Sequence, residues 1–158
     1  MIVKQISNYQ DIADYCKQIE PLLATPEQAY CAKNRMNIWF NYKPNYSKGI
    51  VDTTVGDSKL QKVVDYINPE ADMFQIFYST NMKGINTHKD WRYFEDEAYI
   101  LNLGNGILTI GNKKYTLTGG ELIKFNCHEP HSFKAIDNDR VGIGIWQLKS
   151  CVEKPFRF

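Results

Sequence analysis

The chain has 158 residues, of which 43% are hydrophobic and 23% are charged. This length supports one domain, residues 1–158, and is too short for two ordinary ones, while the composition argues against disorder. The formal net charge is +1, from 19 basic and 18 acidic residues, so composition shows no basic excess of the kind that attracts nucleic acid.

The first part of the chain, residues 1–72, is expected to be a mixed, largely helical support region. Apolar residues at helical spacing predict a helix over residues 11–23. A second helix is expected to begin after Asp57 or Ser58, either of which is a plausible N-cap, and to end at Ile67. Both helices are expected to pack on the outside of a β core.

After residue 72 the sequence pattern changes to short apolar runs separated by glycine turns. The predicted strands are residues 73–79, 99–103, 107–110, 114–117, 122–125, 132–135 and 141–148. Strands this short and closely spaced are typical of a sandwich, barrel or jelly roll, so residues 73–150 are expected to form a β-barrel core. The aromatic segment 36–46 also looks like a strand, with Pro44 indicating an edge or a loop.

The three histidines lie in two short segments, GINTHKDW and FNCHEPHSF. His88 and Asp90 are two residues apart, so on an extended strand both side chains point to one face. An imidazole and a carboxylate that converge in this way make half of a metal site, and His131 or His128 could complete it. A pair of this kind is common by chance, and the alternative is a surface histidine beside a solvated acid.

Residues that follow the His88–Asp90 pair in the sequence bear on its interpretation. A glycine-acid-apolar-phenylalanine segment covers residues 120–125, His131 lies eleven residues past its glycine, and Arg140 follows nine residues later. This order resembles the 2-oxoglutarate/iron(II) dioxygenases, including prolyl-hydroxylase-like and AlkB-like members. The resemblance covers roughly half of the chain.

The resemblance implies a distorted double-stranded β-helix, that is, a cupin-like jelly roll, with the metal site in its mouth. It implies that iron(II) is held by His88, Asp90 and His131, the two-histidine, one-carboxylate set of non-haem iron oxygenases. The open positions would take 2-oxoglutarate and O2. The implied reaction is hydroxylation of an unidentified substrate, with release of succinate and CO2.

Two further residues are candidates for cosubstrate binding. Arg140 would hold the far carboxylate of 2-oxoglutarate, for which a guanidinium is a bidentate partner that is always charged. Tyr78 resembles tyrosines that contact the cosubstrate in the family, although core packing explains it equally well. The family often has a hydroxyl residue two positions beyond the arginine, where this chain has Gly142. This departure leaves the detail of cosubstrate binding open.

Three alternatives compete with this reading. HEPH is not the HExxH motif, and Pro130 argues against the helix that a zincin needs, so His128 is expected to be a rim residue. Cys127 with the two nearby histidines suggests zinc, but a second Cys/His pair and a general base are lacking. A cupin-like module that binds a metal or a small ligand without turnover stays open, although Arg140 favours the oxygenase.

The residues after Asp90 are candidates for substrate contact. Trp91, Arg92 and Tyr93 form either a substrate-facing loop or a turn whose aromatic rings pack on the barrel. A small molecule, an amino acid or a peptide is favoured over nucleic acid, because the site has no dense basic cluster nearby. The sequence indicates neither the substrate nor the oligomeric state.

The cysteines and the N-terminus bear on location. The four cysteines are far apart and form no CxxC pair, which fits neither a disulfide scaffold nor a four-thiolate zinc site; they are Cys16, Cys31, Cys127 and Cys151. The N-terminus has no apolar run of signal-peptide length, and no segment approaches a membrane span. A reducing cytoplasm is therefore the expected location.

Overall fold

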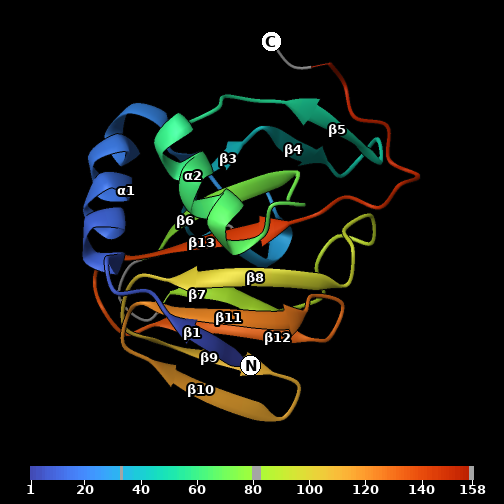
Figure 1. Ribbon diagram of the computed structural model, residues 1–158. Coiled ribbons are helices and arrows are strands. Elements are labelled where there is room, and N and C mark those ends of the chain that lie inside the picture. Colours follow the sequence, from blue (N-terminus) through green and yellow to red (C-terminus); the bar gives the residue numbers. More distant parts are fainter. Residues whose placement is uncertain (33, 80–82, 157–158) are drawn as a thin grey trace.

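The computed structural model describes residues 1–32, 34–79 and 83–156, and most of its elements are antiparallel strands (Figure 1). The helices are α1 (Tyr9–Leu23) and α2 (Ser58–Ile67), with a 3-10 turn, η1, at Tyr30–Ala32. The strands are β1 (Ile2–Gln5), β2 (Thr25–Pro26), β3 (Met36–Phe40), β4 (Tyr42–Asn45), β5 (Ile50–Thr53), β6 (Met73–Ser79), β7 (Gly84–His88), β8 (Glu97–Asn102), β9 (Gly106–Ile110), β10 (Lys113–Leu117), β11 (Glu121–Asn126), β12 (His131–Ala135) and β13 (Arg140–Trp146).

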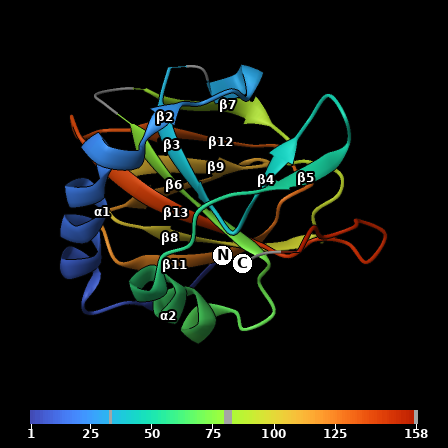
Figure 2. The ribbon, with the colours of Figure 1, turned by 90° about the horizontal axis from the view of Figure 1, so that it is seen from above.

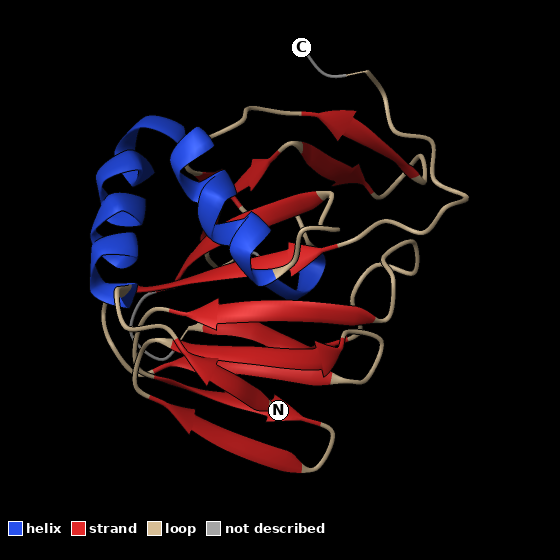
Figure 3. Ribbon diagram, viewed as in Figure 1, coloured by secondary structure: helices blue, strands red, loops and turns tan. Residues whose placement is uncertain are grey.

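Two sheets form the body of the molecule. The main sheet has seven strands in the order β1-β11-β8-β13-β6-β3-β2, and the second has four in the order β10-β9-β12-β7. A separate hairpin pairs β4 with β5. Both helices lie against the side of the main sheet that faces away from the second sheet (Figures 2 and 3). This is the expected cupin-like jelly roll, a distorted double-stranded β-helix with its helices outside.

The central strands β6 and β13 of the main sheet are buried on both faces, and the alternation of their side chains separates two cores. On β6, Phe74, Ile76 and Tyr78 belong to the core beneath the helices, whereas Met73 belongs to the core between the sheets. Every residue of β6 is buried as a result. Residues of odd number on β6 thus face the interior of the jelly roll, and those of even number face the helices.

The predicted helices are confirmed. α1 covers the expected residues 11–23 and begins two residues earlier. α2 begins at Ser58, and the Asp57 side chain accepts a hydrogen bond of 2.9 Å from the backbone N–H of Leu60, as an N-cap does. Within the described residues, neither helix has the length and apolar character needed to cross a membrane.

All seven predicted strands are present, and β6 has the predicted ends, but four of the described strands lie outside the prediction: β1, β2, β5 and β7. β7 has the sequence GINTH, which is mostly polar, because it is an edge strand with few buried side chains. β1 is an exposed edge strand for the same reason. The division expected at residue 72 is not a boundary in the fold, because β1, β2 and β3 are strands of the main sheet.

Candidate metal and cosubstrate site

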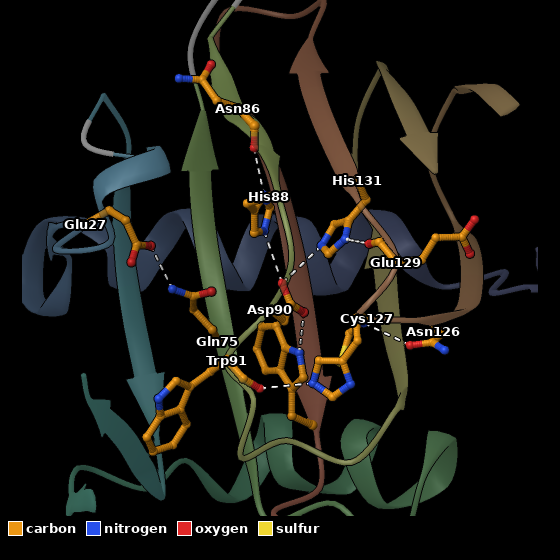
Figure 4. Close-up of polar contacts among 12 residues, drawn as sticks. Glu27, Gln75, Asn86, His88, Asp90, Trp91, Asn126, Cys127, Glu129 and His131 are labelled. Atoms are coloured by element: carbon orange, nitrogen blue, oxygen red, sulfur yellow. Dashed lines mark hydrogen bonds and ion pairs between the residues drawn. The ribbon is translucent and has the colours of Figure 1, made fainter. Parts of the chain in front are cut away.

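Strand pairing brings the two segments that contain the histidines together. β7 and β12 are antiparallel neighbours, and His88 is the direct pairing partner of His131. Their ring centroids are 4.3 Å apart. Asp90 follows two residues after His88, and its backbone N–H donates to the Cys127 carbonyl over 2.8 Å. The sheet therefore places all three side chains at one end of the jelly roll (Figure 4).

One oxygen of Asp90 lies between the two imidazoles. Asp90 Oδ1 is 3.1 Å from His88 Nε2 and 3.0 Å from His131 Nε2. The ligand atoms of the three residues all lie within 4.8 Å of one another. The predicted ligands therefore converge, and His131 rather than His128 is the third member.

Backbone carbonyls fix the orientation of both rings. His88 Nδ1 donates to the Asn86 carbonyl and His131 Nδ1 donates to the Glu129 carbonyl, each over 2.7 Å (Figure 4). In a neutral imidazole the other nitrogen, Nε2, then carries a lone pair. Both lone pairs face the Asp90 carboxylate, so the centre of the site is surrounded by acceptors alone. Such a set needs a cation, and two imidazoles with one carboxylate suit iron(II).

The protonation of the site in the absence of metal follows from the same contacts. Burial opposes ionisation of Asp90, but hydrogen bonds and charge from His131 and His88 outweigh it and hold the pKa of the carboxyl well below its ordinary value. Burial lowers the pKa of His131, but the hydrogen bond to Asp90, the charge of Asp90 and the contacts with Glu129 together outweigh it, so the net shift is upward. A metal ion would replace the proton shared between these groups.

The second oxygen of Asp90 has its own partner. Trp146, the last residue of β13, donates from Nε1 to Asp90 Oδ2 over 2.9 Å. The indole packs on Phe94, with ring centroids 5.1 Å apart. This contact holds the carboxylate so that Oδ1 faces the histidines, an outer-shell arrangement that is usual in metal sites.

Arg140 lies in the same cavity and is only 1% exposed. Its Nε and Nη2 donate to Asn102 Oδ1 over 3.2 and 2.7 Å, and its guanidinium lies 3.5 Å from the centroid of the Phe133 ring. Nη1 has no hydrogen-bond partner among the described residues. A buried donor without a partner is costly, and the carboxylate of a ligand would satisfy it.

The carboxylate of Glu121 is connected to Arg140 through the side chain of Asn102. Asn102 Nδ2 donates to Glu121 Oε1 over 2.9 Å, and Glu121 also accepts from the backbone of Thr118 and Gly119. Burial opposes the charge of Glu121, but these hydrogen bonds lower the net pKa. Burial and the charge of Arg35 depress the pKa of Arg140, and Glu121 opposes that shift. Asn102 thus orients the guanidinium toward the cavity.

The absence of a hydroxyl residue at position 142 has a structural reason. A Cβ atom on Gly142 would lie 2.4 Å from Phe77 Cε2 and 2.9 Å from Arg140 Nη1. The Phe77 ring occupies the space in which a side chain at this position would extend. The space that a hydroxyl residue here would need is therefore filled by an aromatic ring.

Tyr78 does not line the cavity, so the expectation that it contacts the cosubstrate is wrong. Its even position on β6 directs it toward the helices, where its hydroxyl donates to the Cys16 carbonyl over 2.5 Å. The residues of β6 that line the cavity are Gln75 and Phe77. Core packing, the alternative reading, is the correct one.

The residues after Asp90 separate into two groups. Trp91 lines the cavity, and its ring contacts Tyr46 edge-on at a centroid distance of 5.9 Å. Arg92 is exposed and donates to the Tyr93 hydroxyl over 3.0 Å. Neither Arg92 nor Tyr93 lines this cavity; both belong to a shallower depression beside it. The substrate contact expected for this segment is therefore available to Trp91.

His128 and Cys127 bond to residues of the neighbouring loop and do not belong to the His-Asp-His group. The His128 ring bonds to Asp96 and to the Trp91 carbonyl, at 2.8 and 3.2 Å. The Cys127 thiol donates to the Glu95 carbonyl over 3.3 Å. Burial, with the charges of Asp90 and Asp96, raises the pKa of this thiol to about 12, which disfavours the thiolate that zinc would need.

The cavity around these groups has a volume of about 580 Å³, a size typical of small-ligand sites. Sequence reasoning missed several of the polar and aromatic residues that line it or orient its groups: Glu27, Arg35, Gln75, Phe77, Asn102 and Trp146. The sequence contained one signal for these residues, because Gln75 is a polar residue within the mostly apolar strand β6. Glu27 and Arg35 lie in a loop with no recognisable pattern.

Comparison with known proteins gives no match to a protein family and none to a curated protein. Solved structures do match. OsALKBH1 aligns with a TM-score of 0.66 at 9% identity, covering 93% of this chain and 99% of its own. A Pseudomonas putida prolyl-4-hydroxylase aligns at 0.65 and 10%, covering 89% and 86%. An oxidoreductase of the 2OG-Fe(II) oxygenase family from Burkholderia pseudomallei aligns at 0.60 and 11%, covering 85% and 76%.

The chain therefore has the fold of the 2OG-Fe(II) oxygenases, as the order of its residues indicated. At these identities the similarity establishes the fold alone. The class of protein that fold and geometry define is a jelly roll with a His-Asp-His group compatible with a metal ion. The particular reaction has to be argued from the cavity.

Proposed function

We propose that this protein is a non-haem oxygenase that uses iron(II), 2-oxoglutarate and O2 to hydroxylate a small substrate. The observation that carries the proposal is the joint presence, in one cavity, of three converging metal-ligand side chains and a buried arginine with an unpartnered donor. A metal site alone would suit a cupin-like binding module equally well. The arginine adds a place for the far carboxylate of a dicarboxylic acid.

The residues of the chain divide the work between them. His88, Asp90 and His131 would hold iron(II), with Trp146 fixing the carboxylate. Arg140, held by Asn102, would bind the far carboxylate of 2-oxoglutarate and so fix the direction in which the cosubstrate approaches the metal. When bound, iron supplies the oxidising chemistry in which 2-oxoglutarate and O2 yield succinate, CO2 and a hydroxyl group on the substrate.

The rest of the cavity supports a small substrate. Its walls are mostly apolar and aromatic, with Trp39, Trp91 and Trp146 among them, and such walls exclude water and stack on flat or apolar groups. The near-neutral charge of the chain gives no basis for a track along nucleic acid. We therefore expect a small molecule, an amino acid or a peptide segment as substrate.

Binding of 2-oxoglutarate should depend on iron. Because the cosubstrate would contact both Arg140 and the metal, we expect its affinity to be ~5- to 150-fold higher in the iron(II)-loaded protein than in the iron-free protein. Anaerobic calorimetric titration measures both affinities. By linkage, iron should bind more tightly by the same factor when 2-oxoglutarate is present.

Glutarate is the matched control ligand for this titration. It has the same length and both carboxylates but lacks the 2-oxo group, so iron should raise its affinity less than that of 2-oxoglutarate. Equal affinity for 2-oxoglutarate with and without iron would contradict the proposed function.

A further inference from the structure

A second buried arginine lies in the cavity and has no role in the chemistry proposed above. Arg35, in the loop between η1 and β3, is 8% exposed, and its guanidinium lies 4.6 Å from the centroid of the Phe77 ring. Arg140 lies against the same ring, at 5.0 Å. Phe77 therefore separates the arginine proposed for the cosubstrate from a second cation in the same space.

One hydrogen-bond donor of Arg35 has no partner among the described residues. This donor is Nε, and it is buried. The nearest carboxylate oxygen, Glu27 Oε2, lies 3.6 Å away, which is an ion pair but too long for a hydrogen bond. A buried cation that keeps an unpaired donor is expected where a ligand supplies the acceptor.

Glu27 beside it is only partly satisfied. Oε2 accepts from Asn37 and from Gln75, each over 2.8 Å, whereas the contact of Oε1 within the described part of the chain is a long one, 3.4 Å from the backbone N–H of Ala29. Glu27 also lines the cavity. Glu27 and Arg35 thus lie side by side as an anion and a cation, and each can form one more hydrogen bond. In Figure 4 the Glu27–Gln75 contact lies on the opposite side of His88 from His131.

The loop that carries both groups is held in place. The backbone N–H of Glu27 donates to the Arg35 carbonyl over 2.9 Å, and β2 pairs with β3 immediately beyond. The loop is thereby closed at its base, and it forms one wall of the cavity beside β7, the strand that ends at His88. Arg35 and Glu27 are therefore positioned by the fold and not by chance contact.

The charges favour a ligand that carries both signs. Arg35 and Glu27 carry opposite charges and lie side by side, so a ligand with a carboxylate alone would meet the repulsion of Glu27, and an amine alone that of Arg35. A ligand with both groups adjacent would bind to both without adding net charge.

We infer that the Arg35–Glu27 pair is the substrate-binding group of this cavity and that the substrate is a free α-amino acid. Its carboxylate accepts from Arg35, its ammonium group donates to Glu27, and its side chain lies among the aromatic walls toward the metal. Trp39, Tyr46 and Trp91 line the same cavity, which favours an apolar or aromatic side chain. This inference rests on the proposed function and names the substrate class for it.

The test uses the full chain loaded anaerobically with iron(II) and 2-oxoglutarate. Calorimetric titration with L-leucine, L-isoleucine, L-methionine, L-phenylalanine, L-tyrosine and L-tryptophan should detect binding of at least one. The N-acetyl and carboxamide forms of that amino acid should each bind ~10-fold or more weakly, because each removes one of the two charges. This comparison needs no variant and is unaffected if a substitution disturbs folding.

Arg35→Gln should weaken binding of the same amino acid by ~10- to 100-fold, since it removes a charge-assisted contact. Arg92→Gln, a change of the same type at an exposed arginine outside the cavity, should have little effect. If none of the six amino acids binds, if the N-acetyl or the carboxamide form binds as well as the free amino acid, or if Arg35→Gln retains full affinity, the inference is overturned. Loss of iron or 2-oxoglutarate binding in the wild-type protein would instead refute the proposed function.

Discussion

Iron(II) affinity is expected to fall by more than ~100-fold when Asp90 is replaced by alanine. Outer partners of a metal site each contribute ~10- to 100-fold in affinity, and Asp90 would be a direct ligand whose Oδ1 lies 3.0 to 3.1 Å from both histidines. The substitution also removes the negative charge that offsets the cation. Anaerobic titration of iron(II) into the wild-type and variant proteins measures the effect, with circular dichroism to check folding.

The two histidines of the FNCHEPHSF segment provide the matched control. His131→Ala should lose iron to a similar extent, whereas His128→Ala should retain it, because the His128 ring bonds to Asp96 and to the Trp91 carbonyl. Retention of full affinity in His131→Ala, or its loss in His128→Ala, would show that the ligand assignment is wrong.

Replacement of Arg140 by alanine is expected to raise the dissociation constant of 2-oxoglutarate by ~10- to 150-fold. A hydrogen bond to a charged group contributes ~1.5–3 kcal/mol, which corresponds to that range. Arg140 is almost fully buried and its Nη1 has no partner among the described residues, so the carboxylate of the cosubstrate would be its main acceptor. Titration of 2-oxoglutarate into the iron(II)-loaded variant gives the constant.

Arg140→Lys separates the effect of charge from that of geometry, and Arg92→Ala is a control outside the cavity. Arg140→Lys should be intermediate, because it keeps the charge and loses the planar fork. Arg92→Ala should leave the constant near that of the wild type, because Arg92 is exposed and outside the cavity. An unchanged constant in Arg140→Ala would exclude this residue from the cosubstrate site.

Local sequence signals were sufficient for most of the fold. The Asp57 cap predicted the start of α2, and apolar runs between glycine turns predicted seven strands. Four described strands escaped prediction. β1, β2 and β7 are edge strands whose side chains are largely exposed, and β5 belongs to the separate hairpin. An edge strand needs no apolar alternation, so its sequence resembles a loop until its pairing partner is known.

The convergence of His88, Asp90 and His131 was predictable because their order and spacing resemble those of the 2-oxoglutarate/iron(II) dioxygenases. Tyr78 was misplaced for a reason that the sequence could have revealed. Gln75 is a polar residue in the interior of the mostly apolar β6, so it marks the face toward the cavity, and Tyr78 has the opposite parity.

Arg35 and Glu27 were beyond sequence reasoning. They lie in an irregular loop, and what gives them meaning is long-range packing: closure of the loop by β2 and β3, and contact of Arg35 with Phe77 of β6. Asn102 and Trp146 are similar cases, because each acts through a partner from a distant strand or loop. Polar residues of this kind are identified by their partners and not by their neighbours in sequence.

Release of succinate from 2-oxoglutarate in air is the measurement that tests the central claim most directly. It is made with the iron(II)-loaded protein, alone and with a panel of candidate substrates that includes free amino acids. We expect succinate to form in an iron-dependent manner, to increase with one class of substrate, and to be absent with the Asp90→Ala variant. If the wild-type protein binds iron(II) and 2-oxoglutarate yet releases no more succinate than Asp90→Ala across the whole panel, the protein is a binding module and not an oxygenase.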